Sequence, residues 1–151
     1  MDDFIHKLPM DIVLRILPYT YNPQTKELLE DIRNNYQTKN ELFSLYYQWY
    51  IVENGDEEPE DKHWLDNDLG AYINDYKATM FGFVEKHYNI FKRNIFLHGS
   101  SIEETKANID RFVFKLYSKN VMSVINIYLG LLKPHERDEF IRITTRMGVD
   151  I

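Results

Sequence analysis

The feature that most constrains this 151-residue chain is its most apolar window, residues 111–132, which reads RFVFKLYSKNVMSVINIYLGLL. Two apolar stripes at helical spacing lie within it: Phe112, Val113, Leu116 and Tyr117, then Val121, Val124, Ile125, Tyr128, Leu129 and Leu132. Phe114 and Ile127 occupy other sides, which predicts burial on more than one face. A membrane span needs roughly 20 apolar residues with few charges, and Lys115 and Lys119 interrupt this run. The window therefore predicts a central core helix or a tight pair of helices.

Composition limits the class of protein that can form around this window. Hydrophobic residues make up 44% of the chain and aromatic residues 15%, enough for a sizeable core in one domain. The chain has no cysteine, which excludes disulfides, a thiol nucleophile and cysteine-ligated zinc. Its opening, MDDFIHKLPM, lacks the apolar stretch of a signal peptide, so we expect an intracellular protein.

The remainder of the chain predicts further amphipathic helices, and no alternating strand pattern is visible. Helices are expected over residues 8–17, 23–35, 38–52, 64–76, 77–98 and 133–148 in addition to the apolar window, which the stripe extends back to residue 102. Thr38 is expected to cap the third of these helices, because Glu41 follows at capping-box spacing. Gly99 is expected to end a helix, and Ser100-Ser101 to cap the next. The expected fold is an all-α bundle of about six or seven helices around a central hydrophobic helix in the C-terminal half.

Charge is concentrated in one acidic segment. Glu53 to Asp68 holds eight acids and one lysine, a local charge of −7 in a chain whose net charge is −6. Gly55, Pro59 and the repelling carboxylates predict a mobile, solvated loop over residues 53–62. We therefore expect a single domain, 1–151, in which this loop separates N-terminal helices (1–52) from a helical core (63–151).

Candidate catalytic and metal-binding residues are sparse. The segment HERDE, residues 135–139, places Glu139 where a zinc-protease helix needs its second histidine, and acids at a helix N-terminus explain it better. His63, Asp66 and Asp68 could ligate a metal, but the ligand spacing of a calcium loop is missing. No phosphate-binding loop, dinucleotide-binding motif or nucleophile elbow occurs. The sequence predicts a protein that is not an enzyme and needs no metal or cofactor; an enzyme would require a pocket with convergent titratable groups.

Bases and aromatic residues are mixed in the segment 77–98: Lys77, Phe83, Lys86, His87, Phe91, Lys92 and Arg93. Such mixing occurs on faces that bind single-stranded nucleic acid. An isoelectric point near 5.3 argues against phosphate binding, and an amphipathic helix with solvated lysines explains the pattern better. Nucleic acid is therefore not the expected partner.

The opening Leu8-Pro9-Met10-Asp11-Ile12, followed by Ile16-Leu17, resembles the start of an F-box. The resemblance implies that Leu8, Pro9, Ile12, Ile16 and Leu17 dock onto the Skp-type adaptor of a ubiquitin ligase. The sequence departs from the F-box pattern afterwards, because Trp49 falls later than the family's tryptophan and a PYTY turn intervenes. The longer opening, LPMDIVLRILPYTYNPQTKELLEDIRNNY, resembles short proteins of giant DNA viruses. That resemblance implies a viral protein in the host cytoplasm or the virion.

Two functions follow as hypotheses, and the oligomeric state stays open. The first is an F-box-like adaptor or host-interaction module, which requires the five docking residues to be partly exposed. The second is a virion-associated structural or assembly protein whose aromatic side chains contact capsid components.

Overall fold

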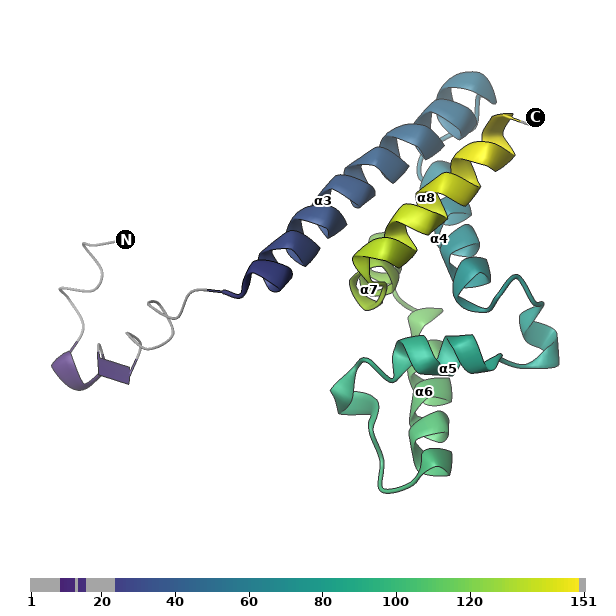
Figure 1. The fold of residues 1–151 in the computed structure, drawn as a ribbon. Coiled ribbons are helices and arrows are strands. Elements are labelled where there is room, and N and C mark those ends of the chain that lie inside the picture. Colours follow the sequence, from purple (N-terminus) through teal and green to yellow (C-terminus); the bar gives the residue numbers. More distant parts are fainter. Residues whose placement is uncertain (1–8, 13, 16–23, 150–151) are drawn as a thin grey trace. The chain divides into compact units, whose positions relative to one another are not determined.

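The computed structural model describes residues 9–12, 14–15 and 24–149 (Figure 1). Its elements in chain order are α3 (Lys26–Tyr46), the π-helical η1 (Tyr47–Glu53), α4 (Glu60–Ile73), the 3-10 turn η2 (Thr79–Phe81), α5 (Glu85–Phe91), the 3-10 turn η3 (Ile95–Leu97), α6 (Ile102–Leu116), α7 (Val121–Leu131) and α8 (Pro134–Val149). Residues 10–12 and 14–15 are also helical. The described residues include no strand, which confirms the predicted all-α class.

The chain divides into two compact units, Met1–Ile32 and Arg33–Ile151. The first unit includes the helical residues 10–12 and 14–15 and the first turns of α3. Every buried apolar side chain of the described residues belongs to the second unit. The second unit therefore has a hydrophobic core of its own, and the expectation of one domain over 1–151 stays a prediction.

The apolar window is divided between two helices, α6 and α7, and does not form one central helix. α6 ends at Leu116, and Asn120 caps α7 by accepting a hydrogen bond from the Ser123 amide. The pair supplies the middle of the core with Ile109, Val113, Leu116, Val124, Ile125, Leu129 and Leu132. Phe114 and Tyr117, predicted to be buried, are instead 77% and 73% exposed. Because Ile109, Val113 and Leu116 define the inward face of α6, each following residue points about 100° away from it.

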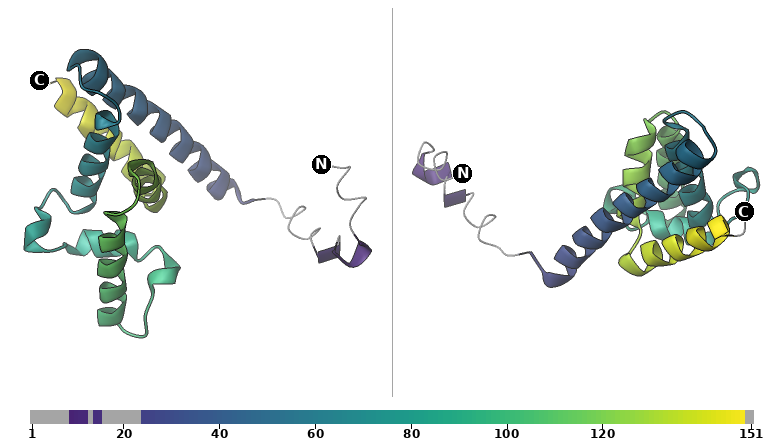
Figure 2. Two further views of the ribbon diagram at one scale, coloured as in Figure 1. Left: turned by 180° about the vertical axis from the view of Figure 1, so that it is seen from behind. Right: turned by 90° about the horizontal axis from the view of Figure 1, so that it is seen from above.

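α6 and α7 each pack against another helix of the second unit. α7 packs mainly against α4, while α6 contacts α5, which crosses it in Figure 1 and in the left view of Figure 2. In the second unit α8 is joined to α3 through Asn34, whose Nδ2 donates to Asp138 Oδ1 at 3.1 Å. Among the described residues, no helix is both long and apolar enough to cross a membrane.

Two predicted helix boundaries are wrong. The expected break between residues 35 and 38 does not exist, because α3 continues through it and leads directly into η1. Thr38 lies inside α3 with 3% of its surface exposed, so it is not an N-cap. Its surroundings lack the glycine or proline that would interrupt a helix. Pro23, the expected start of the preceding helix, lies outside the described residues.

The expected long helix over residues 77–98 is replaced by η2, α5 and η3 with connecting turns. Gly82, with φ +90°, lies in a backbone region that L-residues rarely adopt, and it separates η2 from α5. Asn74 closes the loop before α5: its Nδ2 donates to the Lys77 carbonyl at 2.7 Å and its Oδ1 accepts from the Val84 amide at 2.9 Å. Asn74, which lies outside the predicted helix over residues 77–98, therefore determines where α5 begins.

The acidic segment is only partly a loop. Residues 54–59 are not helical, whereas Glu60 and Asp61 form the first turn of α4, where carboxylates suit the helix dipole. Asp61 is 1% exposed, and Lys62 Nζ lies 3.3 Å from its Oδ2. The predicted loop boundary at residue 62 therefore moves back to residue 59.

Candidate functional site

The predicted docking residues lie in the first unit. Pro9 is exposed and 40% of Ile12 is exposed, while Leu8, Ile16 and Leu17 lie outside the described residues. Their joint role in partner binding stays a prediction.

The first unit also exposes apolar residues that were not predicted as a site. On α3, Leu28, Leu29 and Ile32 are 42%, 42% and 54% exposed. Residues at i, i+1 and i+4 share one side of a helix, so these three form an apolar stripe, named here the α3 stripe. The periodicity of the sequence shows that these three residues share a face, but it does not say what covers that face.

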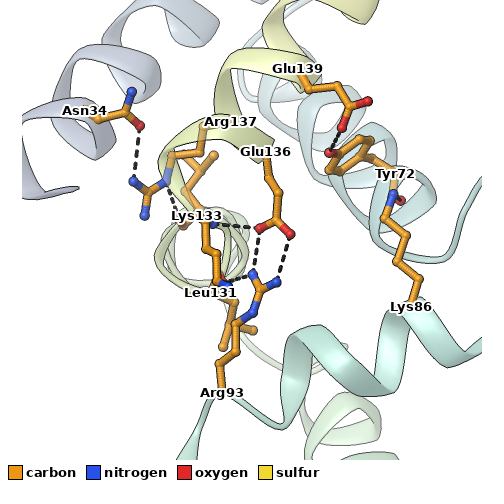
Figure 3. Close-up of polar contacts among 10 residues, drawn as sticks. Asn34, Tyr72, Lys86, Arg93, Leu131, Lys133, Glu136, Arg137 and Glu139 are labelled. Atoms are coloured by element: carbon orange, nitrogen blue, oxygen red, sulfur yellow. Dashed lines mark hydrogen bonds and ion pairs between the residues drawn. The ribbon is translucent and has the colours of Figure 1, made fainter.

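The acids of the segment 135–139 connect helices. Arg93 donates from both terminal nitrogens to the Glu136 carboxylate, at 2.6 and 2.8 Å, and also to the Leu131 carbonyl (Figure 3). Glu139 accepts a hydrogen bond from the Tyr72 hydroxyl at 2.6 Å. Bidentate pairing with a guanidinium orients a carboxylate firmly. These acids thus join α8 to the turn after α5 and to α4.

Arg137 is a buried residue for which the sequence offered no signal. It is 1% exposed, its Nε donates to the Leu129 carbonyl at 2.8 Å, and it reaches Asn34 Oδ1 at 3.2 Å (Figure 3). A buried guanidinium needs such partners because it stays charged. Arg137 therefore holds α7 and α3 to α8.

The mixed basic and aromatic residues do not form one surface. Lys86 donates to the Tyr72 carbonyl at 2.9 Å and lies 3.8 Å from the centre of the Tyr72 ring. Arg93 is paired with Glu136, and both His87 and Phe91 are buried. Several members of the set thus stabilise the fold, whereas the amphipathic-helix explanation expected one helix with solvated lysines.

His63, Asp66 and Asp68 follow one another on α4 but are not gathered around one point. Asp68 accepts a 2.5 Å hydrogen bond from the buried Tyr46, and this bond with burial raises the pKa of the Tyr46 hydroxyl. No group of three or more histidine, aspartate or glutamate residues in the described ranges is placed to hold a metal ion.

A cavity of about 550 Å³ opens in the second unit between α4, the loop before α5, α5 itself, the end of α6 and α7. Its inner wall is apolar and includes Ile73, Phe91 and Leu116, each at most 2% exposed. Exposed residues, Lys77 and Lys119 among them, line its mouth. A concave, mostly apolar site with a few polar groups is typical of small-molecule sites.

Four titratable groups that line the cavity, His87, Asp66, Tyr76 and Tyr128, have shifted pKa values. Burial lowers the pKa of His87 to about 4, so its imidazole is neutral at pH 7. Its ring stacks on Phe83 with centroids 3.9 Å apart, and its Nδ1 has no hydrogen-bond partner among the described residues. Burial also raises the pKa of the Asp66 carboxyl and of the Tyr128 hydroxyl.

These groups converge without a catalytic pairing. In the described part of the chain, no hydrogen bond joins His87, Asp66 and Tyr128 to one another, as a nucleophile and its base would require.

A second hollow, of about 430 Å³, lies beside the N-terminus of α6. Ser101 caps this helix, as predicted, by accepting from the Glu104 amide at 3.1 Å. The amides of Gly99 and Ser100 donate to Thr105 Oγ1 and to the Glu104 carboxylate, so they are already occupied. Gly99 does not end a helix in the predicted manner; a Cβ there would lie 2.8 Å from Glu104 Cβ, so close approach explains this glycine.

Comparison of the chain with protein-family models, with curated proteins and with solved structures finds no match.

Proposed function

We propose that the chain is a non-enzymatic protein–protein interaction module that binds its partner through the first unit. The exposure of the α3 stripe carries this proposal, because a helix that leaves Leu28, Leu29 and Ile32 in contact with water loses the free energy that their burial would supply. Apolar stripes on helices are a common anchor for partners that offer a hydrophobic groove.

The residues that precede α3 support the same proposal. Met10, Ile12 and Leu14 are 71%, 40% and 61% exposed. Ile12 belongs to the docking set implied by the F-box resemblance, as does Pro9, which is also exposed. The more specific proposal is therefore an F-box-like adaptor or host-interaction protein of a large DNA virus, with a Skp-type adaptor as its partner.

The test is affinity purification of the tagged full chain from expressing cells, with variants that alter the two exposed sets separately. Pro9→Asp/Ile12→Asp should abolish co-purification of a Skp-type adaptor, and Leu28→Asp/Ile32→Asp should weaken it strongly. Gln37→Asp/Asn40→Asp is the matched control, since it adds the same charge at exposed polar positions of α3. Partner recovery that is unchanged in both apolar variants would contradict the proposal.

Exposed aromatic residues of the second unit favour an alternative, a virion-associated structural or assembly protein. Phe81, Phe96, Phe114 and Tyr117 are 86%, 91%, 77% and 73% exposed. Large aromatic side chains supply much of the binding energy in protein interfaces.

Purified particles distinguish the two functions. A virion protein should be present in them and should lose incorporation in a Phe96→Ser/Phe114→Ser variant. Pro9→Asp/Ile12→Asp should have no effect on incorporation. Absence from particles, with the adaptor still captured from cells, would leave the interaction module as the function.

A further inference from the structure

The cavity of the second unit has an apolar floor. Ile73, Phe91 and Leu116 come from three different helices and are 1%, 1% and 2% exposed. A polar group placed against them would give up its hydrogen bonds to water without replacement. The volume of about 550 Å³ lies within the range of small-molecule sites, roughly 300–1,000 Å³.

The mouth of the cavity, in contrast to the apolar floor, is charged. Lys77 and Lys119 are exposed and line it, and neither forms an ion pair with a residue that the structure describes. Asp66 is the acid that also lines the cavity. Two cations against one carboxylate reverse locally the sign of a chain whose net charge is −6.

The loop that presents Lys77 is held in one shape. Asn74, 1% exposed, closes it through hydrogen bonds to the Lys77 carbonyl and the Val84 amide. Asp75 and Tyr76 have φ values of 53° and 56°, a left-handed conformation that is uncommon outside glycine. Such conformations cost free energy and persist where surrounding contacts enforce them, often at ligand sites.

We infer that this cavity binds a small amphipathic organic anion, with its apolar body against the floor and its carboxylate at the mouth beside Lys77 and Lys119. The neutral imidazole of His87 adds no charge to the apolar end at pH 7. The inference uses the second unit alone, so it stands or falls independently of partner binding by the first.

The test titrates the full chain with sodium decanoate below its micelle concentration and follows amide resonances by two-dimensional NMR. The amides of Gly70, Lys77 and Lys119 should shift saturably, because all three residues line the cavity, while that of Phe96 should not move. Decylammonium, which has the same chain and the opposite charge, should bind at least about fivefold more weakly, since the lysines repel it.

Variants distinguish decanoate binding in the cavity from nonspecific binding at the surface. Lys77→Gln/Lys119→Gln should weaken decanoate binding about fivefold, the effect of losing two partly solvated ion pairs. Lys115→Gln/Lys133→Gln removes the same charge from exposed positions elsewhere and should leave the affinity unchanged. Ala71→Trp, which places an indole in the cavity, should abolish binding while circular dichroism confirms the fold.

Three results would overturn the inference. The first is equal affinity for decanoate and decylammonium, and the second is unchanged decanoate affinity in the Lys77→Gln/Lys119→Gln variant. The third is a set of shifts that spreads without saturation over exposed apolar residues such as Phe96 and Phe114.

Discussion

At the scale of single residues, Arg137 and His87 offset the free-energy cost of burying an ionisable side chain in opposite ways. Arg137 keeps its charge and satisfies it with the Leu129 carbonyl and the Asn34 side chain. His87 gives up its charge, because its neutral imidazole stacks between Phe83 and Phe91 at far lower cost than an imidazolium would. Both arrangements predict a measurable effect on the free energy of unfolding.

Replacing Arg137 with methionine should lower the free energy of unfolding by about 3 kcal/mol, because the accepting groups around it stay buried without their donor. Arg137→Lys should recover little of this loss, since an ammonium cannot reproduce the guanidinium fork. Urea denaturation measures the change, and Arg142→Met, at an exposed position of the same helix, is the control. Equal effects of Arg137→Met and Arg142→Met would show that the buried contacts are unimportant.

His87 should make the protein less stable in mild acid. Its pKa is about 4 in the folded state and about 6.5 in the unfolded state, so between these values the unfolded chain binds the extra proton. The free energy of unfolding should therefore fall as pH decreases from 6.5 to 4, by about 2 kcal/mol from this residue. Urea midpoints across this range should depend less on pH in His87→Phe than in wild type or in His63→Gln, an exposed control.

At the scale of elements, helix ends and helix contacts depend on different residues. Ser101 and Asn120 cap α6 and α7 with side-chain oxygens, whereas Thr38 is an interior residue of α3. Gly148 also lies inside a helix, α8, and a Cβ there would lie 2.5 Å from Trp49 Cζ2. The sequence had suggested that Gly148 ends this helix, but its role is the close approach of the Trp49 indole.

Cap and interior positions should respond differently to substitution. Ser101→Ala should lower the free energy of unfolding by about 1 kcal/mol, because the Glu104 amide loses its acceptor. Thr38→Val keeps the shape of a buried side chain and should change it by less than about 0.5 kcal/mol. Thermal or urea denaturation compares the two, and a larger loss from Thr38→Val would show that the buried Thr38 hydroxyl makes a stabilising contact.

Two of the helical glycines, Gly148 and Gly130, should respond with opposite signs. Gly148→Ala should destabilise by about 1–3 kcal/mol, since the methyl group must displace the Trp49 indole. Gly130→Ala should stabilise by about 0.5–1 kcal/mol, because its Cβ would meet no described atom within 4 Å and alanine favours the helix. Urea midpoints of the two variants give the comparison, and stabilisation by Gly148→Ala would exclude the close contact.

At the scale of the whole molecule, the chain consists of two units that differ in how they bury apolar surface. The described core, from Leu42 to Phe140, belongs entirely to the second unit, whereas the described apolar side chains of the first unit are exposed. This distribution suits a stable scaffold that carries a binding segment.

A fragment of residues 33–151 should consequently fold alone. It retains every core residue of the described chain, so it should keep a helical circular dichroism spectrum and a cooperative urea transition. A matched fragment that ends at residue 132 removes α8 with Phe140 and Arg137, and it should lose that transition. A non-cooperative 33–151 fragment would instead favour the single domain over 1–151.

Part of the candidate cavity could be anticipated from the sequence and part could not. Phe91, Leu116 and Val124 belong to apolar stripes that predicted burial. The mouth depends on Asn74, whose hydrogen bonds to Lys77 and Val84 join residues that periodicity had assigned to one helix. Short polar contacts of this kind leave no repeating pattern, so hydrophobic spacing cannot reveal them.

The sequence by itself determined the all-α class and the cap at Ser101, because both depend on residues within a few positions of one another. Only the tertiary structure decided that α3 is unbroken, that Phe114 and Tyr117 are exposed, and that Arg93 meets Glu136. The physical reason is that a helical pattern states which side chains share a face, while the partner that covers this face comes from elsewhere in the chain.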